Sequence, residues 1–504
     1  KWWDGRPITA DDVKYTFELG KKYPLTWSGI WDYIDDIKVV DSRTVQFIAK
    51  KEKLNYFQLL SVLYNWVILP KHRFEELERR LGTDIVTFSD NNPNEIIGSG
   101  PYRLKSYDLA TYTMIYERVD DWWGKSLFGL PRPKYIVARC MKDNIAQSSA
   151  FESGETDVSP GFMAAVWEMW EKKGLNRRTY YGHPPYYLPG SIQCLLITYK
   201  KYPLNIPEVR RAIAYAIPYD DICMRYEYNY TVRASPAGVI EWYPAYRKWI
   251  NKTLVEKYWW EEDLETAKRI LDEAGIIDRD GDGVRETANG TKLGPFTIMI
   301  PYGWTDFMAD IEAIAENLNK IGFEVKTEFP EVAVYFDRLY KGQFDMTLAG
   351  AGGPGLGHPW NFYRQLMDPR LTGPIGESHP AGNFERYMNR EVIPLLDAAA
   401  AAISESERMK YYSKLQEILM RDLPGIPIFY GPGWYQFSED YWHGWPREEN
   451  GRWLGIVGWY PSFQLYLNLP VLFYIAPKGE ESVVPSWVQD LQFPTSKFFE
   501  ELSK

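Results

Sequence analysis

The sequence predicts an α/β protein with more than one domain. Its 504 residues are enough for about two to four domain-sized cores, and 45% apolar with 25% charged residues is ordinary for a folded globular chain. Strand and helix signals alternate through most of its length, which favours sheets covered by helices. No apolar run approaches the roughly 18 residues that a membrane span needs.

The chain opens on an Asp-Gly turn that leads directly into a helix. Thr9 is a good N-cap with Asp12 at the capping-box position, and Val13 and Phe17 fall on one helical face. This opening has the pattern of the interior of a longer sequence. We therefore expect a segment to be missing before Lys1.

Alternating elements between residues 263 and 350 predict a largely parallel sheet. Asp263 caps a helix that ends at Gly275, and an apolar strand follows at 295–300. Two further strands, at 323–329 and 344–350, are each preceded by apolar residues at helical spacing. Strands joined by helices in this way pair in parallel.

Charge and cysteine content exclude several classes of function. The formal net charge is −10 and the pI is about 5.3, with no basic stripe of the kind that binds a nucleic-acid backbone. Cys140, Cys194 and Cys223 have neither a Cys-x-x-Cys spacing nor a partnered histidine. The sequence therefore predicts neither a disulfide framework nor a zinc site, although one pair could still form.

The aromatic content of 16%, with 21 Trp and 37 Tyr, is the unusual feature of the composition. Trp and Tyr combine a large apolar face with a polar group, so they suit wet sites where a ring meets a ligand. Many of these rings lie in five loops rich in Gly and Pro, at 299–307, 353–363, 429–437, 441–446 and 457–461.

Short motifs along the chain follow one another in a fixed order. They read DGRPITADDVKYTFE, GSGPYRLKSY, FESGETDV, PEVRRAIAYAI, DLETAKRILDEAGIIDRDGDGVRE, LNKIGFEV, LYKGQFDMTLAG and YYSKLQEILMRDLPGIPIF. In this order they resemble the family-5 extracellular solute-binding proteins of ABC importers, whose members bind peptides, nickel complexes or oligosaccharides. The resemblance extends from residue 3 to about residue 470.

The resemblance implies a two-lobed periplasmic-binding-protein-like fold of type II, in the large family-5 variant, with the first lobe incomplete. It assigns residues 1–100 to a subdomain of the first lobe and 101–200 to that lobe's main sheet. Residues 201–432 would form the second lobe, and 433–504 would return to the first lobe and add a C-terminal extension. Ligand would bind between the lobes, which would close on it by a hinge motion.

The resemblance also implies a transport function without catalysis. The chain would work in the periplasm or outside the cell, as a monomer when complete, either free or held at the membrane by a segment outside this sequence. Its partners would be a permease and an ATPase on separate chains, because this sequence has no P-loop and no membrane span. A carbohydrate-active enzyme is the alternative, and HExxH and GxSxG motifs are missing from the sequence.

The predicted ligand is an oligosaccharide of β-linked glucose or mannose, with a peptide as the alternative. Peptide-binding members hold the α-amino group with an Asp in a segment that here reads GPGLGHPWNFY, without an acid. The stretch YWHGWP resembles oligosaccharide-binding members. Each aromatic ring could equally belong to the core. The candidate ligand residues are Trp304, Asp306, His358, Trp360, Asn361, Trp434, Tyr435 and Trp459.

Asp278, Asp280 and Asp282 alternate in the stretch DRDGDGVRE, a spacing that suits the hard oxygen ligands of calcium. An EF-hand would carry a bidentate Glu where Asn289 stands, and a helix would follow. A solvated turn without metal is therefore the preferred interpretation, and calcium the alternative. The sequence predicts no other cofactor.

GAGGPG, at 350–355, matches the spacing of a dinucleotide-binding loop after a strand. Pro354 stands where a helix should open, and no ribose-binding acid is recognisable. A flexible loop at the edge of the ligand cleft is the preferred interpretation.

Overall fold

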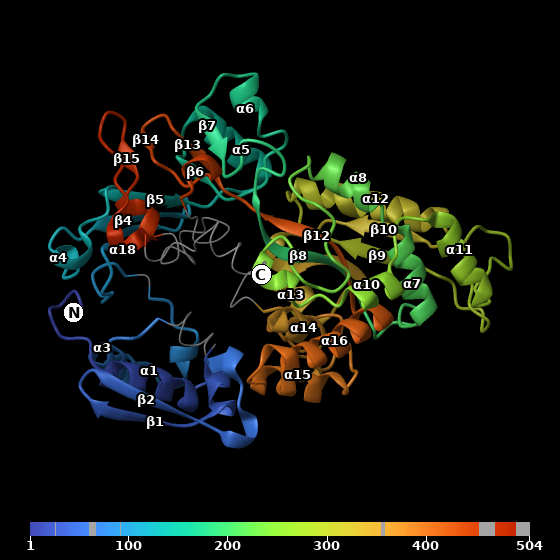
Figure 1. Cartoon of the computed structure of the whole chain (residues 1–504), viewed down its shortest axis with the longest axis horizontal. Coiled ribbons are helices and arrows are strands. Elements are labelled where there is room, and N and C mark those ends of the chain that lie inside the picture. The colour runs from blue at the N-terminus through green and yellow to red at the C-terminus, as the bar shows by residue number, and fades with distance from the viewer. Residues whose placement is uncertain (26, 60–66, 91, 354–357, 453–468, 490–504) are drawn as a thin grey trace. The chain divides into compact units, whose positions relative to one another are not determined.

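The computed structural model describes the chain except for residues 26, 60–66, 91, 354–357, 453–468 and 490–504. Its described residues form two compact units (Figure 1). The first unit contains residues 1–140, 469–476 and 481–489, and the second contains residues 141–452 and 477–480. Among these residues, no helix combines the length and the apolar character that crossing a bilayer demands.

The first unit contains helices, a two-stranded hairpin and an antiparallel sheet of order β3-β4-β5. The predicted capping box is confirmed, since the backbone N–H of Thr9 donates to the Asp12 carboxylate at 2.7 Å. A small core joins Phe17 to Ile30 and Ile37. The elements are α1 (Ala10–Lys22), β1 (Ile34–Asp41), β2 (Thr44–Ala49), α3 (Lys71–Leu81), β3 (Tyr102–Asp108), β4 (Thr113–Arg118), α4 (Lys125–Phe128), β5 (Tyr135–Arg139) and α18 (Ser486–Gln489).

The second unit is built on a five-stranded mixed sheet of order β10-β9-β11-β8-β12 (Figure 1). β9 pairs in parallel with β10 and β11, so the parallel run predicted from the sequence is confirmed. β8 joins this run antiparallel to β11, and β12 pairs antiparallel with β8. The strands are β8 (Leu188–Ile197), β9 (Phe296–Met299), β10 (Val325–Glu328), β11 (Met346–Ala351) and β12 (Gly425–Gly433).

Helices accompany this sheet, and their ends follow the predicted caps. Asp263 accepts a hydrogen bond from the backbone of Thr266 at 2.9 Å and starts α11. Among the described residues that follow the GAGGPG stretch, the next helix is α14, which begins at Trp360, and residues 354–357 lie outside the described residues. The helices are α7 (Pro207–Ala216), α8 (Tyr219–Asp221), α9 (Pro244–Arg247), α10 (Lys252–Tyr258), α11 (Leu264–Glu273), α12 (Thr305–Lys320), α13 (Val332–Lys341), α14 (Trp360–Met367), α15 (Val392–Ala401) and α16 (Glu405–Asp422).

A three-stranded sheet of order β6-β13-β7 completes the second unit, together with α5 and α6. Arg177 is buried there and joins its parts, donating to Phe151 O at 3.0 Å and to Ser438 Oγ at 2.9 Å. The elements are α5 (Asn144–Ser153), β6 (Val158–Ser159), α6 (Glu168–Glu171), β7 (Arg177–Thr179) and β13 (Gln436–Ser438), with the short strands β14 (Trp442–His443) and β15 (Ala476–Pro477) beyond.

The expected boundaries near residues 100 and 200 do not follow the sheets. Residues 101–200, for which the resemblance implies one main sheet, supply strands to three sheets in two units. β8 lies at residues 188–197 and pairs with β11 and β12, far along the chain. Pairing between strands that are far apart in the chain depends on long-range packing, so local sequence patterns do not reveal it.

Candidate functional site

Aromatic side chains from four segments of the second unit pack into one group, called here the aromatic cluster. Trp434 meets Tyr187 edge to face, with ring centroids 4.9 Å apart, and Phe162 at 5.7 Å. Trp167 stacks on Tyr186 at 5.4 Å and 15°. The cluster consists of Phe162, Trp167, Trp170, Tyr186, Tyr187, Tyr228, Tyr230 and Trp434.

Four members of the aromatic cluster, Trp167, Trp170, Tyr228 and Trp434, are only partly buried. A pocket of about 260 Å³ adjoins the cluster at Phe162. Its lining also includes Met163 and Met169, polar side chains of α5, and Thr305 at the start of α12. The pocket thus combines apolar and aromatic walls with a few hydroxyl and amide groups, as small-molecule sites do.

The backbone around the aromatic cluster is strained. Ala165, Tyr186, Tyr228 and Asn229 have φ of 45°, 62°, 52° and 58°, in the left-handed region that residues other than glycine rarely adopt. Hydrogen bonds hold two of them, from Tyr186 N to His183 O at 2.8 Å and from Asn229 N to Cys223 O at 3.0 Å. Such strain is concentrated at functional sites, where the surrounding structure maintains it.

Two buried carboxyl groups lie on α12, which begins at the pocket residue Thr305, and a third interacts with them. Asp306, in the first turn of α12, is 5% exposed and accepts a hydrogen bond from Asn144 Nδ2 at 3.1 Å. Asp310, one turn further on, and Glu227 are fully buried. Burial raises the pKa of Asp306 to about 6, and burial together with the neighbouring carboxyl charges raises the pKa of Glu227 and of Asp310 well above the ordinary range. Glu227 and Asp310 therefore resist ionisation more strongly than exposed carboxyl groups do.

Asp306 is among the ligand residues predicted from the sequence, whereas Glu227 and Asp310 are not. One signal was available for Asp310. Asp306, Asp310 and Ile314 are spaced at i, i+4 and i+8, so the two acids continue the apolar face that Ile314 marks on α12. Carboxyl groups on the buried face of an amphipathic helix are uncommon and indicate a site or a buried proton.

The predicted tryptophans have different surroundings. Trp434 belongs to the aromatic cluster. Trp304 is partly buried, and its ring neighbours include Phe307 at 5.9 Å and Tyr335 at 6.0 Å rather than members of the cluster. Trp360 is only 2% exposed, and its indole N–H donates to Leu396 O at 2.9 Å, so it is a core residue without a ring face for a ligand. Trp459 lies outside the described residues.

The remaining predicted ligand residues also lie apart from the pocket lining. Tyr435 is fully buried, with Phe437 5.1 Å from its ring. His358 lies beside Trp249 at 4.8 Å, and burial together with the charge of Arg408 lowers its pKa to about 4. Asn361 is exposed in the first turn of α14. Tyr435 is therefore a packing residue, and partly buried His358 contacts the Trp249 ring rather than the pocket lining.

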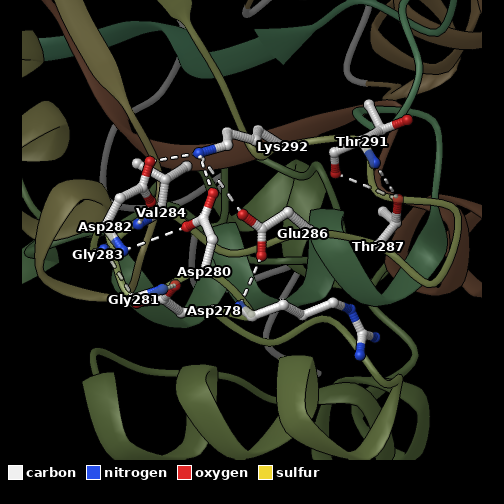
Figure 2. Close-up of polar contacts among 11 residues, drawn as sticks. Asp278, Asp280, Gly281, Asp282, Gly283, Val284, Glu286, Thr287, Thr291 and Lys292 are labelled. Atoms are coloured by element: carbon white, nitrogen blue, oxygen red, sulfur yellow. Dashed lines mark hydrogen bonds and ion pairs between the residues drawn. The ribbon is translucent and has the colours of Figure 1, made fainter.

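The three predicted metal ligands do lie together. Asp278, Asp280 and Asp282 form a turn between α11 and β9, and Glu286 joins them (Figure 2). One carboxylate oxygen from each of the four lies within 4.8 Å of the others. Lys292 extends into the same group. The turn shares no residue with the pocket or the aromatic cluster.

Comparisons with known proteins agree with this fold. A periplasmic oligopeptide-binding protein of an ABC transporter from Thermotoga maritima, solved with mannohexaose bound, is 36% identical, with a TM-score of 0.84 over 95% of this chain and 86% of that one. The dipeptide-binding protein of Escherichia coli is 23% identical over 85% of this chain and 76% of its own length. The oligopeptide-binding protein AppA of Bacillus subtilis is 24% identical over 85% of this chain and 73% of its own length.

Most of the chain matches one protein family. Residues 1–372 match the family described as bacterial extracellular solute-binding proteins, family 5. The fold is the two-lobed type II fold of periplasmic binding proteins, as the mixed sheet and its solved relatives show. The chain therefore belongs to the family-5 bacterial extracellular solute-binding proteins and is the solute-binding component of an ABC importer.

Proposed function

We propose that this protein captures an oligosaccharide of β-linked mannose or glucose units outside the cytoplasm and delivers it to a separate permease and ATPase. The aromatic cluster beside the pocket is the observation that carries the proposal. The mannohexaose bound to the Thermotoga maritima relative supports it, since that relative matches 95% of this chain at 36% identity.

The chemistry of the site suits a sugar. Flat aromatic rings pack against the apolar C–H faces of pyranoses, and the partly exposed Trp167, Tyr228 and Trp434 can supply such faces. Sugar hydroxyl groups both donate and accept hydrogen bonds. The amide of Asn144 and the hydroxyl groups of Ser148 and Thr305, which line the pocket, can do the same.

A peptide is the second candidate, because both curated relatives reported above are described as peptide-binding. A peptide needs a carboxylate for its α-ammonium group. The two carboxylates in the described pocket lining, Glu152 and Glu168, are already paired with Lys173 at 2.7 Å and Lys172 at 2.6 Å. An ammonium group would have to share one of these carboxylates with a lysine, and the repulsion between the two cations favours the neutral saccharide.

Isothermal titration calorimetry of the whole chain tests the proposal. The ligands are mannohexaose, cellohexaose, a pentapeptide and the same pentapeptide with an acetylated amino group. We expect a saccharide to bind and both peptides to give no heat. Binding of the free peptide alone, with no response to either saccharide, would contradict the proposal.

Trp434→Ala and Trp434→Phe locate the site within the aromatic cluster. We expect the alanine variant to weaken saccharide binding about tenfold or more, equivalent to ~1.4 kcal/mol, and phenylalanine to restore part of the affinity. Trp259→Ala is the matched control, because Trp259 is 44% exposed and lies outside the cluster. Full affinity in Trp434→Ala would exclude this ring from the site.

A further inference from the structure

The turn between α11 and β9 folds around its own aspartates. Asp278 accepts hydrogen bonds from the backbone N–H groups of Gly281 at 2.7 Å and Gly283 at 2.9 Å. These two glycines have φ of 79° and 91°, so the tight turn requires residues without a Cβ. Asp280 Oδ1 accepts from Asp282 N at 3.2 Å, which uses only one of the two Asp280 oxygens.

The second oxygens of Asp280 and Asp282 converge on the ammonium group of Lys292 (Figure 2). Asp282 Oδ1 accepts from Val284 N at 2.8 Å, while its Oδ2 meets Lys292 Nζ. Asp280 Oδ2 lies 2.9 Å from the same Nζ. Each of these aspartates thus holds the loop with one oxygen and faces a common cationic centre with the other.

Glu286 provides an independent indication of a ligand. The residue is 4% exposed and is held by backbone bridges to Ile277 and Lys292. Its Oε2 accepts from Arg279 N at 2.8 Å. Its Oε1 is buried, has no hydrogen-bond partner among the described residues, and lies 3.7 Å from Lys292 Nζ. A buried carboxylate oxygen without a hydrogen bond is costly, and a cation at this point would satisfy it.

The groups around the Lys292 ammonium carry an excess of negative charge. Three carboxylates, those of Asp280, Asp282 and Glu286, pair with the single ammonium group of Lys292, and the Asp278 carboxylate lies beside them. The two arginines of the turn serve other groups, since the guanidinium of Arg279 donates to Gly275 O and that of Arg285 pairs with Asp272. A divalent cation would offset more of the excess negative charge than an ammonium group does.

We propose that Asp278, Asp280, Asp282 and Glu286 form a calcium site, and that the Lys292 ammonium group is the internal cation that calcium displaces. Calcium accepts six to eight oxygen ligands in a flexible arrangement, whereas magnesium demands a nearly regular octahedron and keeps much of its water. The carboxylates occupy positions 1, 3, 5 and 9 of the turn, and position 12 holds Asn289 instead of the bidentate Glu of an EF-hand. We therefore expect an affinity in the range of extracellular modules, with Kd about 10⁻⁴–10⁻³ M.

Calcium titration of the chelator-treated, dialysed whole chain tests the proposal. We expect one calcium ion per chain by calorimetry, a higher Tm in CaCl2, and a weaker effect of MgCl2 at the same concentration. Neither heat nor a shift in Tm up to ~10 mM CaCl2, in both the wild type and Lys292→Met, would overturn the proposal, because this concentration is well above the expected Kd.

The lysine variant tests the displacement itself. Lys292→Met removes the competing charge, so it should tighten calcium binding at least about fivefold, the size of one charge interaction at ~4 Å in water. Lys268→Met is the matched control and should leave the affinity unchanged, because Lys268 is 35% exposed against 37% for Lys292 and pairs outside the turn. Unchanged affinity in Lys292→Met would refute the displacement.

Two acid variants locate the ion. Asp280→Asn and Glu286→Gln should each weaken calcium binding about tenfold or more. Asp272→Asn is the control, since Asp272 has the same 55% side-chain exposure as Asp280 but lies outside the four-carboxylate group. If Glu286→Gln does not fold, Asp280→Asn decides the question. Wild-type affinity in Asp280→Asn would place the ion elsewhere and overturn the proposal.

Discussion

Arg210, on α7, is a fully buried charged residue whose guanidinium group joins distant backbone segments. It donates to Leu423 O at 2.7 Å, to Pro424 O at 3.0 Å and to Ile197 O at 3.1 Å. Its charge also lies 3.8 Å from the centre of the Tyr199 ring. A single side chain therefore connects the end of β8 to the segment that leads from α16 into β12.

We expect Arg210→Met to lower the free energy of unfolding by ~3–5 kcal/mol, because methionine leaves several buried carbonyl groups without donors. Urea denaturation of the purified chain measures this change. Arg269→Met, on the exposed face of α11 with 60% side-chain exposure, is the control and should change stability by no more than ~0.5 kcal/mol. Equal stability of Arg210→Met and the control would show that these hydrogen bonds contribute little.

At the scale of elements, α12 carries two buried acids, Asp306 and Asp310, that face a third, Glu227. Burial raises the pKa of all three in the folded chain, to about 6 for Asp306. Between the ordinary pKa near 4 and the raised folded pKa, the folded state binds more protons than the unfolded state. The free energy of unfolding therefore falls as pH rises through this window, and the penalty disappears below about pH 4.

We expect the ionisation of Asp306 alone to lower the free energy of unfolding by roughly 3 kcal/mol between pH 4 and pH 8. Asp310→Asn should raise the stability at pH 8 and flatten the dependence on pH, because it removes a carboxyl group that resists ionisation. Denaturation curves at several pH values measure both effects.

Glu312→Gln, an exposed position on the same helix, is the control for this experiment and should leave the pH profile unchanged. If the free energy of unfolding of Asp310→Asn depends on pH as that of the wild type does, burial does not couple the ionisation of the three carboxyl groups.

At the scale of the whole molecule, a two-lobed solute-binding protein is expected to close on its ligand by a hinge motion. Small-angle scattering should show a smaller radius of gyration with saturating mannohexaose than without it. Trp434→Ala, at a saccharide concentration that saturates only the wild type, should retain the ligand-free profile. Identical wild-type profiles with and without bound saccharide would contradict closure.

The sequence by itself determined the features that depend on near neighbours in the chain. The caps of Thr9 and Asp263 and the parallel run from residue 295 to residue 350 were predicted and are confirmed. Hydrogen bonds of a cap and the periodicity of a helix involve residues only a few positions apart, so a single sequence contains them. The order of the family's motifs similarly indicated the family.

Only the tertiary structure decided which aromatic and acidic side chains lie together. Trp360 and Trp434 both occur in aromatic sequence stretches rich in Gly and Pro, yet one is a core residue that begins α14 and the other belongs to the aromatic cluster. Glu227 meets Asp310 across 83 positions of the chain. Burial and such pairings depend on long-range packing, which is a property of the folded chain as a whole and leaves no local pattern in its sequence.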